Sequence, residues 1–172
     1  MADGTKRAGV TLARRPELGK LLLRAGDDAA KLAASALQRP WPVGINSASG
    51  DADDRTLRLG PDEYLLIVPR PAVAGLLGRL EPALAGRHHA VVDLSARFAV
   101  LEIEGAAVCP TLAAACPLDL HETVLAADAA TRTVLGKAEI ILDRLALDRF
   151  RLIVNRTYMP YVEALLREFG VA

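Results

Sequence analysis

The chain has 172 residues, of which 52% are hydrophobic and 4% aromatic, and its 21 basic and 21 acidic side chains cancel to a net charge of zero. This length suits one domain or two small fused units, and it allows a core that buries about 70% of the unfolded surface. The lack of net positive charge and the scarcity of stacking side chains argue against a nucleic-acid-binding protein.

Signals for export and membrane insertion are missing from the sequence. Two cysteines cannot build a disulfide scaffold, and so few thiols suit a reducing compartment. The N-terminal residues are basic without an apolar segment, unlike a signal peptide. The longest uncharged run, 105–118, is too short to span a bilayer. We therefore expect a cytoplasmic globular protein that binds neither membranes nor nucleic acid, with a flexible tail over residues 1–18.

Hydrophobic periodicity and turn residues predict alternating strands and helices in the first half. Asp27 or Asp28 is suited to cap the first helix, which ends before Pro40, and Pro71 opens the second helix. The predicted elements are a strand at 21–24, a helix from 27, a short strand at 43–45, a polar loop at 46–54, strands at 56–59 and 63–68, a helix over 71–82 and a buried strand at 90–94.

The second half shows a similar order of elements. Ala99, Leu101 and Ile103 alternate along its first strand and therefore share one face. Thr157 is suited to cap the last helix, and Gly170 to end it. The predicted elements are a strand at 98–104, an Ala-rich helix ending before 117, strands at 131–135, 137–143 and 150–154, and a last helix with the apolar positions Tyr158, Tyr161, Val162, Leu165 and Phe169.

The two halves also contain a repeated sequence. Residues 59–70 read LGPDEYLLIVPR and residues 145–156 read LALDRFRLIVNR, so half of the aligned positions are identical and Tyr64 stands opposite Phe150. A repeat this long indicates a duplicated α+β unit. We expect one unit over 19–95 and a second over 96–172, each an antiparallel sheet with helices on one face. In each unit, the sheet face without helices must be covered by the other unit or by another protein.

A thiol and an imidazole lie close together in the segment CPLDLH. Cys116, Asp119 and His121 could supply a nucleophile with its base or half of a metal site. The only other cysteine is Cys109, and a tetrahedral site would need distant His88 or His89 as well. We therefore favour a structural role, with Cys109 and Cys116 as small apolar residues that share a helix face.

Two further groups of polar residues have the types that catalysis uses. His88, His89, Asp93 and Ser95 are the residue types of a hydrolase triad, but alternation along one strand separates them and no G-x-S-x-G motif is present. Glu102 and Glu104 project from one strand face. They could do acid–base work, and we favour a solvated or partner-facing surface. Common nucleotide-binding motifs are missing too.

Several segments together resemble a known family over about residues 16–170. They are LGPDEYLLIVP (59–69), VVDLSARFAVLEIEG (91–105), CPLDLH (116–121), LGKAEIIL (135–142) and FRLIVNRTYMPYVEALL (150–166). In this order they look like the gamma subunit of heterotetrameric sarcosine oxidase. More distantly, they resemble the N-terminal region of the glycine-cleavage aminomethyltransferase, at Asp93-Leu94-Ser95, Gly105, Ala138-Glu139 and Val154-Asn155.

This resemblance implies two tandem ferredoxin-like units that together form an aminomethyltransferase-like, folate-binding-like fold. It implies a non-catalytic subunit in the oxidative demethylation of sarcosine to glycine, within one-carbon metabolism. The partners would be the alpha, beta and delta subunits, which carry FAD, FMN, NAD, tetrahydrofolate and zinc, while this chain carries no cofactor.

One departure from the aminomethyltransferase pattern bears on catalysis. Ala138 and Glu139 replace a pair of aspartates, so we assign no catalytic, cofactor-binding or metal-binding residue to this chain. Asp93, Ser95 and Asn155 are expected to hydrogen-bond the local backbone instead. The alternatives are a stand-alone tetrahydrofolate-binding or aminomethyltransferase-like domain, and a subunit of a related N-methyl amino-acid oxidoreductase. The mean hydropathy of +0.24 predicts self-association of the isolated chain.

Overall fold

The computed structural model describes residues 9–171. The chain divides into two compact units, one built from residues 16–97 and the other from residues 98–171 together with the segment that ends at residue 15. The first part of the predicted N-terminal tail, residues 1–8, lies outside the described residues. Each unit is an antiparallel sheet with helices, so the predicted α+β class with two such units is confirmed.

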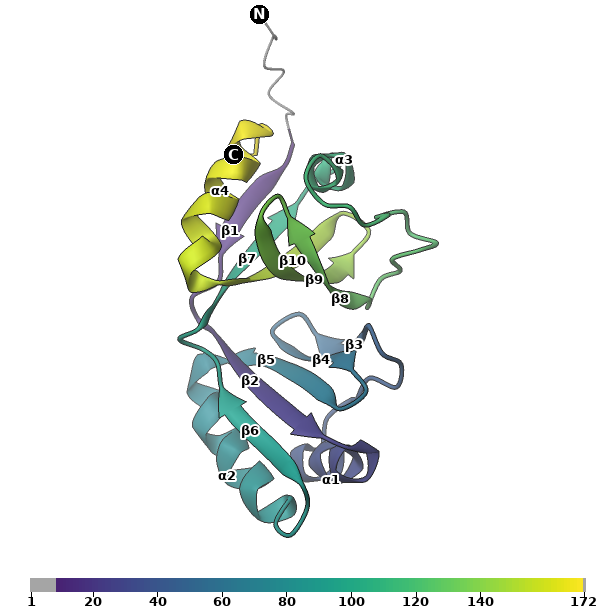
Figure 1. The fold of residues 1–172 in the computed structure, drawn as a ribbon, viewed down its shortest axis with the longest axis vertical. Coiled ribbons are helices and arrows are strands. Elements are labelled where there is room, and N and C mark those ends of the chain that lie inside the picture. The colour runs from purple at the N-terminus through teal and green to yellow at the C-terminus, as the bar shows by residue number, and fades with distance from the viewer. Residues whose placement is uncertain (1–8, 172) are drawn as a thin grey trace, which may run out of the picture. The chain divides into compact units, whose positions relative to one another are not determined.

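The 16–97 unit has five antiparallel strands in the order β3-β4-β5-β2-β6 (Figure 1). Without the edge strand β3, its chain order is the β-α-β-β-α-β order of ferredoxin-like folds. The elements are β2 (Leu18–Ala25), α1 (Asp27–Leu37), β3 (Ser47–Asp51), β4 (Asp54–Gly60), β5 (Glu63–Pro69), a 3-10 turn (Arg70–Ala72), α2 (Val73–Ala83) and β6 (His89–Asp93).

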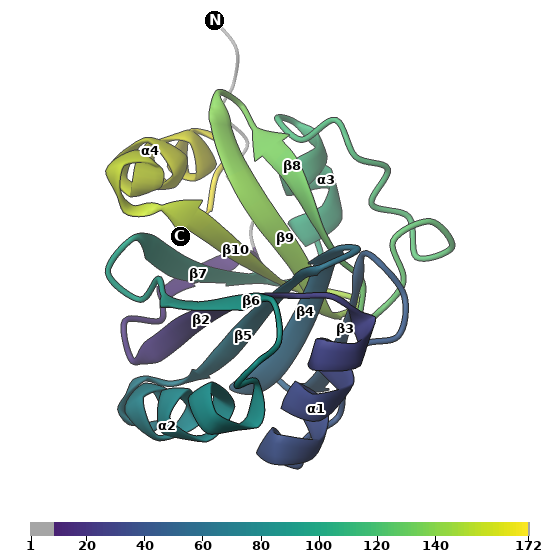
Figure 2. The same cartoon turned by 60° about the horizontal axis from the view of Figure 1, so that its bottom comes forward.

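Both helices of this unit pack on the same face of its sheet (Figure 2). Leu21, Leu23 and Leu66 point from β2 and β5 into a fully buried cluster. Ala33 of α1 and Leu80 of α2 close this cluster, and neither is exposed. The apolar alternation along the strands and the helical spacing on α1 and α2 therefore direct one face of each element into a single core.

The second unit has the same arrangement of strands and helices as the first, except that one edge strand comes from a different part of the chain. Its sheet order is β1-β7-β10-β9-β8, again with antiparallel pairing throughout. The elements are β1 (Thr11–Arg14), β7 (Phe98–Glu104), α3 (Val108–Ala113), β8 (Ala130–Leu135), β9 (Ala138–Ala146), β10 (Arg149–Asn155), a 3-10 turn (Arg156–Tyr158) and α4 (Met159–Glu168). The strand that would follow α4 in a ferredoxin-like order is instead β1, from the N-terminal segment.

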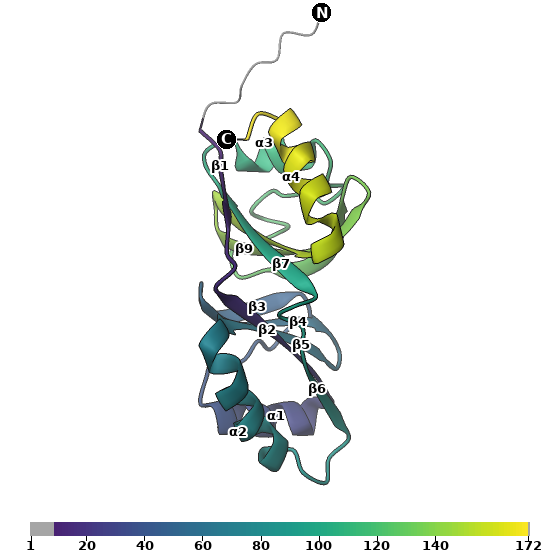
Figure 3. The ribbon, with the colours of Figure 1, turned by 90° about the vertical axis from the view of Figure 1, so that its left-hand side faces the viewer.

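Strand β1 corrects the prediction of a flexible tail up to residue 18. It runs antiparallel to β7, with Thr11 opposite Glu104 and Arg14 opposite Leu101 (Figure 3). The backbone N–H of Arg15 extends the pairing by donating to the carbonyl of Val100 at 2.9 Å. Four residues are too short for a periodic signal, and the partner strand lies far along the sequence, so the prediction failed here.

The repeated sequence corresponds to repeated structure. Strand β5, the 3-10 turn after it and α2 begin 86 residues before β10, the second 3-10 turn and α4. The backbone angles agree as well, since Pro69 has φ −54° and ψ 132° and Asn155 has φ −53° and ψ 130°. Each copy therefore turns from strand into helix in the same way.

Some predicted local features differ from the structure. Residues 43–45 are not a strand, while the predicted loop at 46–54 contains β3, which hydrogen-bonds to β4 around Gly50. Gly50 has φ +100°, and a Cβ there would collide with the carbonyl of Asp54, so this tight hairpin requires glycine. Strand β6 is an edge strand with mostly exposed residues, not a buried one. Pairing across the sheet, rather than local composition, decides these cases.

The predicted helix caps also differ. The N-cap of α1 is Gly26, not Asp27 or Asp28, and no side chain caps that helix. Thr157 lies inside the 3-10 turn before α4 instead of capping the helix. Tyr161 is 36% exposed while Leu166 is fully buried, so α4 rotates its buried face away from the predicted stripe.

Within residues 9–171, no helix is both long and apolar enough to cross a membrane.

Candidate functional site

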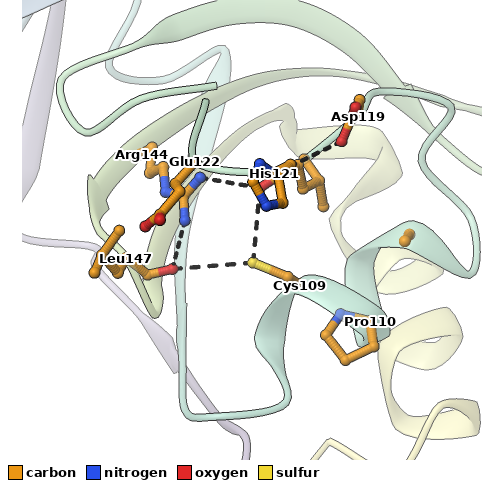
Figure 4. A pocket seen from close by; sticks show the side chains of 9 residues that line it. Cys109, Pro110, Asp119, His121, Glu122, Arg144 and Leu147 are labelled. Atoms are coloured by element: carbon orange, nitrogen blue, oxygen red, sulfur yellow. Dashed lines mark hydrogen bonds between the residues drawn. The ribbon is translucent and has the colours of Figure 1, made fainter. Parts of the chain in front are cut away.

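A pocket of about 500 Å³ opens beside α3 in the second unit, and we call it the α3 pocket (Figure 4). It is formed by one face of α3, the following loop and the end of β9. The lining residues are Cys109, Pro110, Ala113, Asp119, Leu120, His121, Glu122, Arg144 and Leu147. Three residues singled out from the sequence, Cys109, Asp119 and His121, therefore do meet in one place.

Arg144 holds the wall of the α3 pocket together. The residue is only 3% exposed, and its guanidinium lies 5.0 Å from the ring centroid of Phe150. The guanidinium donates to the backbone carbonyls of Leu120 at 3.0 Å, Leu125 at 2.5 Å and Leu147 at 2.8 Å. A buried charge needs such hydrogen bonds. Arg144 therefore anchors the loop after α3 against the sheet.

Three polar side chains of the α3 pocket are engaged locally. A carboxylate oxygen of Asp119 accepts a 2.9 Å hydrogen bond from the backbone N–H of His121. The imidazole Nδ1 of His121 lies 2.8 Å from the hydroxyl of Thr123. The thiol of Cys109 faces the backbone carbonyls of Leu120 and Leu147 at 4.0 and 3.9 Å. These contacts stabilise the loop and provide no nucleophile–base–carboxylate chain.

Cys116 lies apart from the other members of its motif. It follows the end of α3, it is buried, and its sulfur lies 3.7 Å from the hydroxyl of Thr133. The prediction that Cys109 and Cys116 share a helix face is therefore wrong, because α3 ends at Ala113. Both thiols are free. Among the described residues, no group of three or more His, Cys, Asp and Glu side chains is placed to hold a metal ion.

Asp93 and Ser95 form the backbone turn expected from the sequence. Asp93 accepts a 2.8 Å hydrogen bond from the N–H of Ser95, and the buried Ser95 hydroxyl accepts from the N–H of Lys20 at 2.9 Å. The hydrogen bonds with Ser95 hold the pKa of Asp93 below its usual value, with help from Arg70 and Lys20. This turn fixes the end of β6 beside β2.

The two histidines do not join this turn into a triad. His88 is exposed, and the Nδ1 of His89 lies 2.9 Å from the carbonyl of Arg87. His88 and Ser95 lie outside β6, and His89 and Asp93 each make a separate local contact.

Glu102 is the centre of a buried ion cluster, which corrects the prediction of a solvated or partner-facing side chain. It is 6% exposed and accepts hydrogen bonds from Arg15 and Arg149 at 2.6 Å and from Arg151 at 2.7 Å. Burial alone would raise the pKa of Glu102, but the hydrogen bonds from the three guanidinium groups outweigh it and lower the pKa to about 2. Glu104, on the same strand, is exposed as predicted.

A second ion pair fastens the N-terminal strand to the last helix. Arg14 of β1 donates twice to Glu163 of α4, at 2.5 and 2.6 Å. Glu163 is 3% exposed, and the hydrogen bonds from Arg14 lower its pKa. Neither this pair nor the Glu102 cluster was found from the sequence, because the partners are far apart along the chain and no local pattern marks them.

The positions matched to the aminomethyltransferase pattern carry no paired acids. Ala138 is fully buried opposite Leu135, and Glu139 is exposed at the start of β9. Asn155 is the N-cap residue of the second 3-10 turn, but its side chain makes no capping hydrogen bond, so the expected hydrogen bond to the local backbone is not made at this cap.

Comparison with known proteins identifies the family. Residues 25–170 match the family model described as the sarcosine oxidase, gamma subunit family. A sarcosine oxidase subunit gamma from Arthrobacter sp. is 35% identical over 147 residues, which cover 84% of this chain and 71% of the relative. That of Corynebacterium sp. strain U-96 is 33% identical over 122 residues, and there the match spans 70% of this chain and only 58% of the relative.

Solved structures agree with this assignment. The chain matches a chain of the heterotetrameric sarcosine oxidase from Corynebacterium sp. U-96, solved in complex with pyrrole 2-carboxylate. The TM-score is 0.84 and the sequence identity 30%, and the match covers 95% of this chain and 86% of the Corynebacterium chain. The glycine cleavage system aminomethyltransferase T from Bartonella henselae shares the fold, with a TM-score of 0.68 and 16% identity over 94% of this chain and 46% of that one. Sequence and structure together therefore show that this chain belongs to the sarcosine oxidase gamma subunit family.

Proposed function

We propose that this chain is the gamma subunit of a heterotetrameric sarcosine oxidase and has a structural, non-catalytic role in the oxidative demethylation of sarcosine to glycine. The match to a chain of the heterotetrameric Corynebacterium enzyme, over nearly all of both chains, carries this proposal. A chain that shares the fold of a subunit over 95% of its own length is suited to the same place in an assembly.

The local geometry supports the non-catalytic part of the proposal. Asp93 and Asp119 accept hydrogen bonds from backbone N–H groups, and Glu102 is buried among three arginines. A general acid or base needs a pKa near the working pH and access to a substrate proton. Glu102, held ionised in a buried cluster, has neither property.

The proposal places the reactive groups on other chains. The alpha, beta and delta subunits would carry FAD, FMN, NAD, tetrahydrofolate and zinc, and the complex would feed one-carbon metabolism in the cytoplasm. This chain would stabilise those subunits by burying apolar surface, as obligate interfaces of about 2,000 Å² or more do. The identity of each partner and cofactor, and the cytoplasmic location, remain predictions.

Co-expression tests the structural role directly. The chain is produced together with the candidate alpha, beta and delta subunits, and the same set is produced without it. We expect a flavin-containing complex that includes this chain, and a lower yield of assembled complex without it, with turnover per flavin unchanged in what does assemble. A full yield of stable complex without the chain, or failure of the chain to co-purify, would contradict the proposal.

The second candidate function is that of a tetrahydrofolate-binding or aminomethyltransferase-like domain, favoured by the fold shared with aminomethyltransferase T. Isothermal titration of the isolated chain with tetrahydrofolate separates the two functions, since micromolar binding would favour the second candidate. A complex that oxidises another N-methyl amino acid faster than sarcosine would make the chain a subunit of a related oxidoreductase.

A further inference from the structure

Each unit contains the same arginine-on-aromatic arrangement. Arg58 in β4 and Arg144 in β9 are 86 residues apart, like the repeated segments that follow them. The Arg58 guanidinium lies 5.4 Å from the ring centroid of Tyr64, and that of Arg144 lies 5.0 Å from the centroid of Phe150. Each arginine also donates to the carbonyl three residues further on, at 3.0 and 2.8 Å. The duplication therefore produced two corresponding sites.

In the 16–97 unit this arginine borders a second pocket, which we call the α1 pocket. It has a volume of about 480 Å³, within the range of small-molecule sites. Two of its lining residues, Ala30 and Ala34, are alanines four residues apart on α1 and therefore share one side of the helix. The lining residues are Asp27, Ala30, Lys31, Ala34, Ser35, Trp41, Pro42, Val43, Arg58 and Tyr64.

Aromatic side chains form one wall of the α1 pocket. The rings of Trp41 and Tyr64 are 5.1 Å apart between centroids and inclined by 41°. Tyr64 is almost fully buried, whereas Trp41 is partly exposed. Such a wall suits the face or edge of another aromatic ring.

The loop that carries Trp41 is held in place before any ligand arrives. Arg58 donates to the carbonyl of Val43 at 2.6 Å and accepts, through its own carbonyl, from the N–H of Asn46 at 2.8 Å. The hydroxyl of Ser47 donates to the carbonyl of Gly44 at 2.5 Å. A preorganised loop loses little entropy on binding, which favours affinity.

Two N–H donors at the α1 pocket lack an acceptor. The indole Nε1 of Trp41 and the Nε of Arg58 are buried and have no hydrogen-bond partner in the described structure. In the other unit, the corresponding Nε of Arg144 donates to the carbonyl of Ala146 at 3.2 Å. Because buried donors are nearly always paired, the two unpaired donors indicate an acceptor supplied from outside the chain.

The charges at the pocket favour an anionic acceptor. Its charged lining residues are Asp27, Lys31 and Arg58, which sum to one positive charge. Asp27 pairs with Arg58 at 2.9 Å, but the Asp27 side chain is 71% exposed and can turn into solvent at little cost. A ligand carboxylate can therefore take its place beside the guanidinium.

From these observations we propose that the α1 pocket binds an aromatic carboxylate. Its ring lies against the partly exposed Trp41, which packs on Tyr64, and its carboxylate accepts hydrogen bonds from the Trp41 indole and the Arg58 guanidinium. The binding is independent of the proposed role in subunit assembly, because every group involved belongs to this chain.

Trp41 is the single tryptophan of the chain, so one indole N–H signal reports on the pocket. The 172-residue chain is labelled with ¹⁵N and titrated with 2-naphthoate. We expect a saturable downfield shift of the indole N–H signal, because the carboxylate becomes its hydrogen-bond acceptor. Uncharged 2-naphthalenemethanol and non-aromatic cyclohexanecarboxylate should each bind at least about tenfold more weakly. An indole signal that 2-naphthoate leaves in place, or moves no more than the two analogues do, overturns the proposal.

Three variants locate the site. Ala34→Leu fills the α1 pocket and should abolish the saturable shift. Ala113→Leu makes the same change at the α3 pocket of the other unit and should leave the titration unchanged. Lys31→Gln removes an exposed charge without touching the core and should weaken binding about threefold. Unchanged affinity in Ala34→Leu would place 2-naphthoate elsewhere and refute the assignment. If Ala34→Leu fails to fold, unchanged affinity in Lys31→Gln refutes it instead.

Discussion

At the scale of single residues, buried charges in the second unit serve as structural ties. Glu102 joins Arg15, Arg149 and Arg151, which come from the N-terminal segment and from β10. An isolated carboxylate would not tolerate this burial, but three guanidinium groups satisfy its oxygens. The cluster therefore acts as a clamp on the strands around β7.

Replacement of Glu102 measures the strength of this clamp. Glu102→Gln removes the anion that all three guanidinium groups share, while Asp143 stays 3.6 Å from Arg151 and Glu104 stays 3.7 Å from Arg149. The change should lower the free energy of unfolding by about 3 kcal/mol. Glu104 lies two residues away and is exposed, so Glu104→Gln should change the free energy of unfolding by less than about 0.5 kcal/mol. Urea denaturation monitored by circular dichroism compares the two variants. Equal stabilities would contradict a stabilising role of the Glu102 cluster.

The lowered pKa of Glu102 makes the stability of the fold depend on pH. The folded pKa of Glu102 is about 2, below its ordinary value of 4.5, so its stabilising contribution is fully present above pH 4.5. That contribution is lost as the pH falls from 4.5 towards 2, because the unfolded chain binds the proton first. Denaturation midpoints measured over this range should fall less steeply in Glu102→Gln than in the wild type.

At the scale of elements, the N-terminal strand completes a sheet that the C-terminal half does not complete. Strand β1 occupies the edge of β7, and Arg14 ties it to Glu163 of α4. Gly105 at the end of β7 allows this close approach. It has φ +136°, and a Cβ there would collide with the carbonyl oxygen of Gly9.

Gly105→Ala should therefore push the N-terminal segment away and destabilise the unit by about 2–4 kcal/mol. Gly78→Ala is the matched control, since Gly78 lies in α2 with no atom near its missing Cβ. Alanine favours a helix over glycine by about 0.5–1 kcal/mol, so this control should be stabilised. Hydrogen exchange followed by mass spectrometry should show faster exchange in β1 and β7 for Gly105→Ala only; unchanged protection there would speak against the close approach.

At the scale of the whole molecule, the turn at Asp93 and Ser95 stands where the chain passes from one unit to the other. Asp93→Ala removes the acceptor that holds Ser95. We expect a lower yield of assembled oxidase with unchanged turnover per flavin. Asp62→Ala, which breaks an exposed pair with Arg24, serves as control and should leave the yield unchanged. A large loss of turnover in an intact Asp93→Ala complex would instead indicate a catalytic role.

The sequence by itself determined the duplication and most of the strands and helices, though not β1 or β3, because their signals are local: alternation as in Ala99, Leu101 and Ile103, and identities between 59–70 and 145–156. Only the tertiary structure decided that residues 11–14 complete the second sheet, that Glu102 is buried, and that Cys109 rather than Cys116 lies beside His121. Each of these features depends on contacts between segments that are far apart in the sequence. Such contacts produce no hydrophobic periodicity in either segment, so the sequence pattern does not reveal them.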